Sequence, residues 1–151
     1  MRIVCPAFPE GGTIPSYYAK AGDNISPPLV LCEVPPAARS LALILEDPDA
    51  PRGLFTHWIV FNLRPDATFG ENQVPRGARQ GKNSWDEPRY GGPQPPDREH
   101  RYFFRLFALD DILDLPDGVT RDELEAAMCG HVITQAALMG RHAPLATGAS
   151  D

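Results

Sequence analysis

Short runs of apolar residues, separated by proline- and glycine-rich stretches, are the main pattern along this chain. Residues 41–45 (LALIL) lie between prolines and predict a strand that is buried on both faces at the centre of the fold. Residues 57–63 and 100–109 are rich in β-branched and aromatic side chains and predict two further strands. A short strand is also expected within residues 2–8. Most of the predicted secondary structure is therefore β.

One amphipathic helix is expected near the C-terminus, from about Arg121 to Met139. Thr120 followed by Glu123 forms a capping-box sequence at its start, and Gly140 is expected to end it. Positions at helical spacing are Leu124, Ala127, Met128, Val132, Gln135 and Leu138. This largely apolar stripe predicts a helix that packs on the core, and no ligand site is expected on it.

The chain has 17 prolines and 13 glycines among its 151 residues. Proline breaks helix interiors and glycine weakens them, so this composition disfavours a helical bundle. Residues 64–99 show no sustained period of either kind, and a loop of that length is usually functional. Because no repeat or linker is visible, residues 1–151 are expected to form one domain of short strands joined by shaped loops.

A formal net charge of −6 disfavours non-specific binding to nucleic acid or to anionic membranes. No stretch approaches the roughly 18 apolar residues of a membrane span, so no membrane insertion is expected. The three cysteines, Cys5, Cys32 and Cys129, show no CxxC pairing. They predict buried small hydrophobes and no disulfide framework, which favours a cytoplasmic location.

Two polar groups stand at the ends of predicted strands. Residues 47–51 (DPDAP) follow the buried strand, and two prolines in five residues hold the carboxylates of Asp47 and Asp49 in place. A solvated turn is an equal alternative for this segment. His57 begins the next strand, where strict alternation places it on one face with Ile59 and Phe61. By itself His57 is more simply a surface or core histidine than a ligand contact.

A third group lies at the start of the most aromatic strand. His100 and Tyr102 are two residues apart, so they share a face of that strand and offer hydrogen-bond donors beside an apolar wall. An amphipathic strand end is the plain alternative. Residues 91–96 (GGPQPP) allow close approach of the backbone to a ligand, although an ordinary loop fits equally well.

The combination of these segments resembles the phosphatidylethanolamine-binding protein family, including its bacterial Raf-kinase-inhibitor-like members. The resemblance runs from Ile14 to about His142, over nearly the whole chain. It is carried by IP at 14–15, SPPL at 26–29, SLALI at 40–44, DPDAP at 47–51, HW at 57–58, YGGP at 90–93, PP at 95–96 and HRY at 100–102.

The resemblance implies antiparallel, sandwich-like β-sheets with one main helix near the C-terminus. It also implies a small pocket that binds phosphate-like groups and needs no cofactor. The residues carried over to the pocket are Asp47, His57, His100 and Tyr102, with Gly92 and Pro93 on its rim. Asp49, Ala50, Pro51 and Trp58 are carried over as structural residues, with a cis bond expected at Ala50–Pro51. Family members are ligand-binding scaffolds and inhibitors of kinases or proteases, and pairing as a homodimer is left open.

Two other functions compete with anion binding. A hydrolase would combine Asp47, His57 or His100 with a hydroxyl such as Ser84, but no nucleophile-elbow motif is present. A metal site from Asp47, His57 and His100 lacks a local ligand pair such as HxH. The chain also departs from the family pattern at residues 97–99 (DRE), which bring negative charge next to His100. The sequence therefore predicts a small-anion binding protein and not an enzyme.

Overall fold

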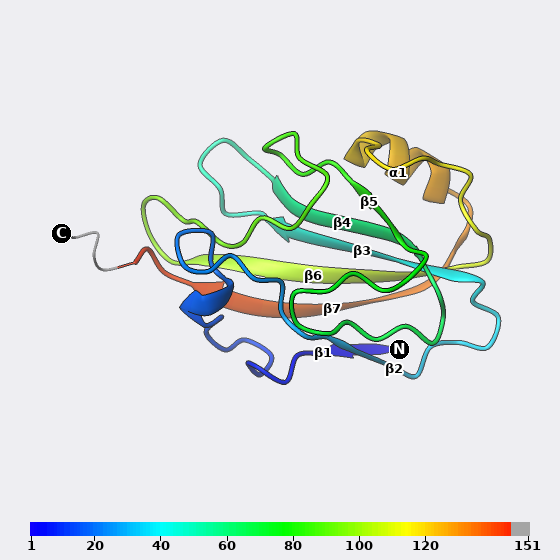
Figure 1. The fold of residues 1–151 in the computed structure, drawn as a ribbon, viewed down its shortest axis with the longest axis horizontal. Coiled ribbons are helices and arrows are strands. Elements are labelled where there is room, and N and C mark those ends of the chain that lie inside the picture. The colour runs from blue at the N-terminus through cyan, green and yellow to red at the C-terminus, as the bar shows by residue number, and fades with distance from the viewer. Residues whose placement is uncertain (146–151) are drawn as a thin grey trace.

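The computed structural model describes residues 1–145, and Figure 1 shows the arrangement of its elements. The chain forms seven strands, one α-helix and one short 3-10 helix within this range. In chain order these are β1 (Arg2–Val4), η1 (Ser16–Tyr18), β2 (Val30–Cys32), β3 (Ser40–Asp47), β4 (Phe55–Leu63), β5 (Arg79–Gly81), β6 (His100–Leu109), α1 (Arg121–Met128) and β7 (Val132–His142). The mainly β prediction is confirmed.

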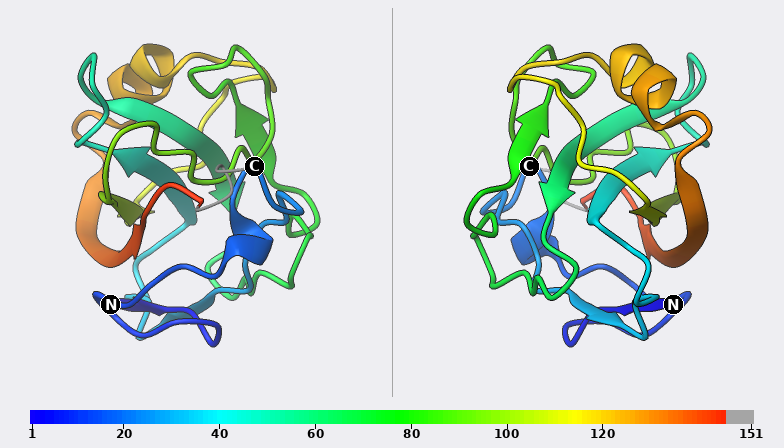
Figure 2. Two further views of the ribbon diagram at one scale, coloured as in Figure 1. Left: turned by 90° about the vertical axis from the view of Figure 1, so that its left-hand side faces the viewer. Right: turned by 90° about the vertical axis from the view of Figure 1, so that its right-hand side faces the viewer.

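A five-stranded antiparallel sheet forms the body of the domain, in the order β5-β4-β3-β6-β7. The predicted central strand is β3, whose eight residues are all buried because β4 and β6 flank it and both of its faces are covered. β1 and β2 form a separate two-stranded antiparallel sheet. Figure 2 shows this small sheet below the large one and α1 above it.

The two faces of the large sheet carry separate apolar clusters, which we call the α1 face and the β1–β2 face. The α1 face joins the sheet to the helix through Ala42, Ile44, Ile59, Phe61, Leu124 and Met128. The β1–β2 face is larger and includes Ile3, Phe8, Leu43, Trp58, Val60, Tyr102 and Phe104. This two-sided covering explains why the central strands read as continuous apolar runs.

The predicted helix is correct at its start and wrong at its end. The capping box forms, since Thr120 Oγ1 accepts from Glu123 N at 3.1 Å and Glu123 Oε1 accepts from Thr120 N at 2.8 Å. The helix stops at Met128, and Gly130 follows with a φ of +84°, which glycine adopts without strain. Residues 132–142 then form β7, which pairs with β6 along its whole length. Long-range pairing has overridden an apparent helical period.

Three smaller expectations can also be compared with the structure. The strand expected within residues 2–8 is shorter, because β1 ends at Val4 and only an isolated bridge joins Cys5 to Phe8. Cys5 is buried as expected, whereas Cys32 is half-buried and Cys129 is exposed just after α1. The long irregular section 64–99 contains one short strand, β5.

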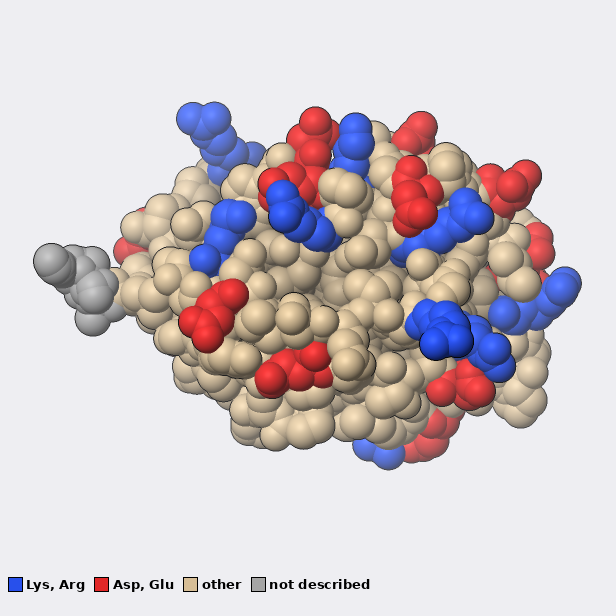
Figure 3. Space-filling model, viewed as in Figure 1, with Lys and Arg blue, Asp and Glu red and all other residues tan. Residues whose placement is uncertain are grey.

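The antiparallel order brings the end of β3 and the starts of β4 and β6 to the same end of the sheet, at the left in Figure 1. On the face shown in Figure 3, acidic and basic side chains are interspersed, with no broad patch of one sign. None of the helices described in residues 1–145 is long and apolar enough to cross a membrane.

Candidate functional site

A buried carboxylate–imidazole pair marks this end of the sheet. Asp47 closes β3 and His100 opens β6, and Asp47 Oδ2 lies 2.6 Å from His100 Nδ1. Both residues are almost fully buried. A contact this short between a carboxylate and a ring nitrogen fixes the orientation of the imidazole and places a hydrogen on Nδ1.

The turn after β3 is fastened to β6 by a second carboxylate. Asp49 accepts hydrogen bonds from Nε and Nη2 of Arg101 and from its backbone N–H, each at 2.9 Å. This bidentate pairing holds the pKa of Asp49 well below its usual range. Asp47 Oδ1 accepts from Asp49 N at 2.8 Å, so the two carboxylates are held relative to each other.

The expectation of a cis bond at Ala50–Pro51 is wrong. No peptide bond within residues 1–145 is cis. The contacts of Asp49 with Arg101 shape this turn with a trans bond at Pro51.

His57 reaches the same place because β4 is irregular. Leu45 pairs with Trp58 and Glu46 pairs with Thr56, so His57 is an extra residue that forms a β-bulge. The bulge turns His57 to the β1–β2 face, away from Ile59, and its ring centroid lies 5.3 Å from that of Tyr102. The expectation from strict alternation is therefore wrong at this position.

The ring of His57 is held by the loop that contains Gly91. Its Nδ1–H donates to Gly91 O at 2.8 Å, and Gly91 N–H donates to His57 O at 3.0 Å. Burial lowers the pKa of His57 to about 4. At neutral pH the ring is therefore uncharged, and its Nε2 carries a lone pair.

This buried neutral histidine predicts a pH-dependent stability. The folded pKa of about 4 lies below the usual histidine pKa of 6.5, so the unfolded chain takes up the proton first as the pH falls. The contribution of His57 is complete above pH 6.5 and is lost between pH 6.5 and 4, by up to about 3 kcal/mol. Urea unfolding at pH 7, 5.5 and 4.5 should show this loss in the native chain and not in His57→Asn. Equal pH profiles would show that His57 titrates normally.

Gly92 and Pro93 contact segment 18–24 through their backbone atoms. Gly92 N–H donates to Asn24 Oδ1 at 2.8 Å, and Pro93 O accepts from Lys20 N at 3.0 Å. Both residues are buried against the segment 18–24. Neither lines the pocket described next, so their role in this structure is to position Gly91 and the loop after it.

Tyr102 lies beneath the histidines with its ring fully buried. Its hydroxyl has no hydrogen-bond partner among the described residues. Burial, followed by the charge of Asp47, raises the pKa of this phenol far above its usual value. A buried hydroxyl without a partner is costly, so this atom is a candidate contact for a ligand or an ordered water.

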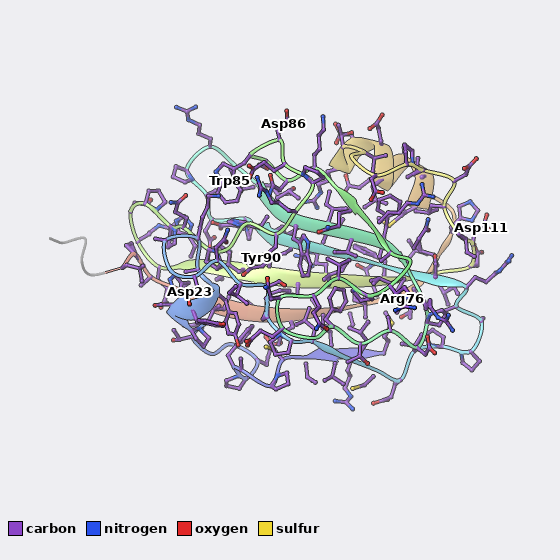
Figure 4. The ribbon with its side chains drawn as sticks, in the orientation of Figure 1. Asp23, Arg76, Trp85, Asp86, Tyr90 and Asp111 are labelled. Atoms are coloured by element: carbon purple, nitrogen blue, oxygen red, sulfur yellow. The ribbon has the colours of Figure 1, made fainter. Side chains whose placement is uncertain are left out.

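A pocket of about 610 Å³ opens at this end of the sheet, and Tyr102 is not among the residues that line it. Asp47, His57 and His100 lie in its wall, and Arg52 and Gln94 bring a guanidinium and an amide. The remaining wall is mostly apolar and consists of Ala50, Pro51, Gly53, Leu54, Phe55, Trp85 and Pro96. Figure 4 shows Trp85 near the start of β4. A concave apolar site with a few convergent polar groups is the usual form of a small-molecule pocket.

Two residues were not expected from the sequence: Trp85, which lines the pocket, and His142, which does not. Trp85 packs edge-on against His57, with 5.2 Å between their ring centroids, although it comes from the irregular section before β6. Trp58, expected as a structural residue, is buried on the β1–β2 face and donates from Nε1 to Gln80 Oε1 at 2.8 Å. His142 was also missed; it pairs with His100 across β6 and β7, and its Nε2 is buried without a partner among the described residues.

Comparison with known proteins identifies the family of this fold. The sequence profile described as phosphatidylethanolamine-binding protein matches residues 5–143. This chain belongs to the phosphatidylethanolamine-binding protein family. Within the family it is 50% identical to a UPF0098 protein of Chlamydia pneumoniae over 94% of this chain and 98% of that protein. It is 48% identical to a UPF0098 protein of Methanothermobacter thermautotrophicus, over 93% of this chain and 97% of that protein.

Solved structures of the phosphatidylethanolamine-binding protein family have the same fold. A Chlamydia trachomatis protein named as a homolog of phosphatidylethanolamine-binding protein superposes with a TM-score of 0.89 at 44% identity, covering 93% of this chain and 95% of that one. The YbcL protein of Escherichia coli, named as a member of the mammalian family, gives a TM-score of 0.87 at 24% identity, covering 93% of this chain and 96% of that one, and at that identity it supports the fold alone.

The hydrolase and metal-site alternatives can be compared with the structure of this family member. Ser84 is exposed; its Oγ accepts from Thr56 N at 2.8 Å, and it lines another pocket with Lys82 and Arg121. Within residues 1–145, no three histidine, cysteine or acidic side chains are grouped so that they would hold a metal ion.

Proposed function

We propose that this protein binds a small anion, either phosphate or a phosphorylated headgroup, in the pocket formed by Asp47, His57, His100 and Tyr102, and that it acts as a binding protein and not as an enzyme. The observation that carries the proposal is the unpartnered Tyr102 hydroxyl, buried beside a carboxylate–imidazole pair under an open pocket. Ligand oxygens are natural partners for a hydroxyl that the folded chain leaves unsatisfied.

Two exposed donors support the proposal. Arg52 and Gln94 line the pocket and are exposed, so their guanidinium and amide groups are free to meet the charged oxygens of a bound anion. The apolar wall around Phe55 and Trp85 limits hydration inside the pocket, which strengthens such contacts. Hydrolysis has less support, because no histidine within residues 1–145 is among the hydrogen-bond partners of Ser84.

Phosphate titration followed by NMR tests this proposal. At pH 6, phosphate or phosphoethanolamine should shift the side-chain signals of His57 and His100 and leave those of His131, which lies outside the pocket, unchanged. Tyr102→Phe removes only the hydroxyl, so it should keep the fold and weaken phosphate binding by about tenfold, the worth of one hydrogen bond to a charged group. If neither ligand moves the His57 and His100 signals, the pocket does not bind anions.

A further inference from the structure

His100 has no free N–H to offer a ligand. Its Nδ1 lies 2.6 Å from Asp47 Oδ2, and its Nε2 lies 2.8 Å from Asp97 Oδ1. Asp97 stands three residues before His100, and its side chain is 49% exposed while that of His100 is 1% exposed. The hydrogen bond to His100 lowers the pKa of Asp97, so its carboxylate is ionised at neutral pH. Both ring nitrogens of His100 therefore lie against carboxylate oxygens.

His57 likewise faces the pocket as an acceptor. Its single N–H, on Nδ1, is used by Gly91 O, which leaves the lone pair of Nε2. Asp47 and Lys20 are the charged groups that act on this ring, and they act in opposite directions. Lys20 itself is held over the Trp85 ring, with Nζ 4.2 Å from the ring centroid. Burial dominates, so the ring stays neutral above about pH 4.

Donors and acceptors in the pocket are therefore divided. The acceptors are the inner groups His57 Nε2 and Asp47, with Asp97 behind His100. The donors in the pocket wall are Arg52 and Gln94, which are exposed, whereas Tyr102 is fully buried and does not line the pocket. An anion whose oxygens are all ionised would place at least one oxygen against these acceptors, which costs affinity. An anion with a hydroxyl would donate it to an acceptor and turn its charged oxygens to Arg52.

We propose that this pocket selects oxyanions that carry a hydrogen of their own, namely phosphate and phosphomonoesters, over sulfate and phosphodiesters, and that Asp97 sets this preference by holding the outer N–H of His100. The inference rests on the proposed anion binding and names its ligand class. A phosphodiester, the linkage that joins a headgroup to a phospholipid, has no such hydrogen. Asp97→Ala would leave Nε2 of His100, a residue of the pocket wall, without its carboxylate partner and would remove a negative charge.

Calorimetric titration with four small probes tests this selection at pH 5.0. Methyl phosphate and dimethyl phosphate each carry about one negative charge there, because the second pKa of a phosphomonoester is about 6. Their comparison therefore isolates the hydrogen from the charge, and inorganic phosphate against sulfate gives a second pair. In the native chain the hydrogen-bearing member of each pair should bind about tenfold more tightly, the worth of one charged hydrogen bond.

The variant arm uses Asp97→Ala with Glu99→Ala as its control. Glu99 lies two residues away, its side chain is also 49% exposed, and it pairs with Arg141 at 3.9 Å. Both variants remove one negative charge, but only Asp97→Ala frees His100. Asp97→Ala should tighten sulfate binding by about tenfold and bring the phosphate-to-sulfate ratio close to one. Glu99→Ala should leave the ratio unchanged.

Equal affinity of the native chain for methyl and dimethyl phosphate overturns the selection while anion binding stands. A ratio that Asp97→Ala does not change, or that Glu99→Ala changes equally, overturns the role of Asp97. Failure of all four probes to bind overturns both this inference and the proposed function.

Discussion

Replacing Glu46 with alanine should lower the free energy of unfolding by about 3 kcal/mol. Glu46 is only 4% exposed, and its two carboxylate oxygens accept from Arg105 Nε and Arg121 Nη2, each at 2.6 Å. Arg121 also donates to Thr56 Oγ1 at 3.0 Å, so the carboxylate ties α1 to β3, β4 and β6. Without it, two guanidinium groups would remain partly buried with no buried counter-charge.

The expected loss is at the lower end of the range for broken buried ion pairs, because the Arg105 side chain is 35% exposed and water would solvate it in part. Urea unfolding at pH 7 measures the effect. Glu33→Ala is the matched control, since Glu33 pairs with Arg2 at 2.7 Å but both side chains are more than half exposed. That control should leave stability unchanged within error. Similar losses in the two variants would show that Glu46 acts as an ordinary surface pair.

Gly92→Ala should destabilise the protein by about 3 kcal/mol and also weaken phosphate binding. A Cβ at this position would overlap the carbonyl oxygen of Tyr18 and would lie 2.9 Å from the backbone carbon of Ala19 and the backbone nitrogen of Lys20. Backbone atoms cannot rotate away, so the whole loop would shift. Because the neighbouring Gly91 carbonyl holds Nδ1 of His57, that shift would disturb the pocket as well.

Gly70→Ala is the comparison for this prediction. A Cβ there would meet only the side chain of Gln73, whose far end is flexible and can move aside. Its cost should stay below about 1 kcal/mol, and phosphate binding should be unaffected. Thermal unfolding and phosphate titration of the two alanine variants provide the measurements. A Gly92→Ala protein as stable as Gly70→Ala would show that segment 18–24 yields easily.

The strands could be predicted from sequence where burial is two-sided. β3 and β6 match their predicted ranges closely, because apolar and aromatic runs between prolines leave few alternatives. β7 could not be predicted, since Val132 and Ile133 are exposed and Leu138 is also compatible with a helical stripe. What makes this segment a strand is its antiparallel pairing with β6, an interaction with residues far away in sequence.

The candidate site could be predicted only in part, because contacts between residues far apart in sequence bring it together. His100 and Tyr102 share a strand, so their common face follows from the period of two. Asp47 joins them because β3 and β6 are antiparallel, which only the topology reveals. Trp85 comes from an irregular section that has no period to read, and its contact with His57 appears only in three dimensions.

The bulge at His57 has a consequence for protein engineering. Anyone who transplants this pocket into another antiparallel sheet would have to copy the irregular pairing opposite Leu45 and Glu46 along with the side chains. On an idealised strand of regular register the imidazole would turn toward the opposite layer, among aliphatic groups and far from its carboxylate neighbour. The irregularity in β4 is therefore the feature that such a design must keep. A redesign that makes β4 regular would take His57 out of the pocket even if the sheet still formed.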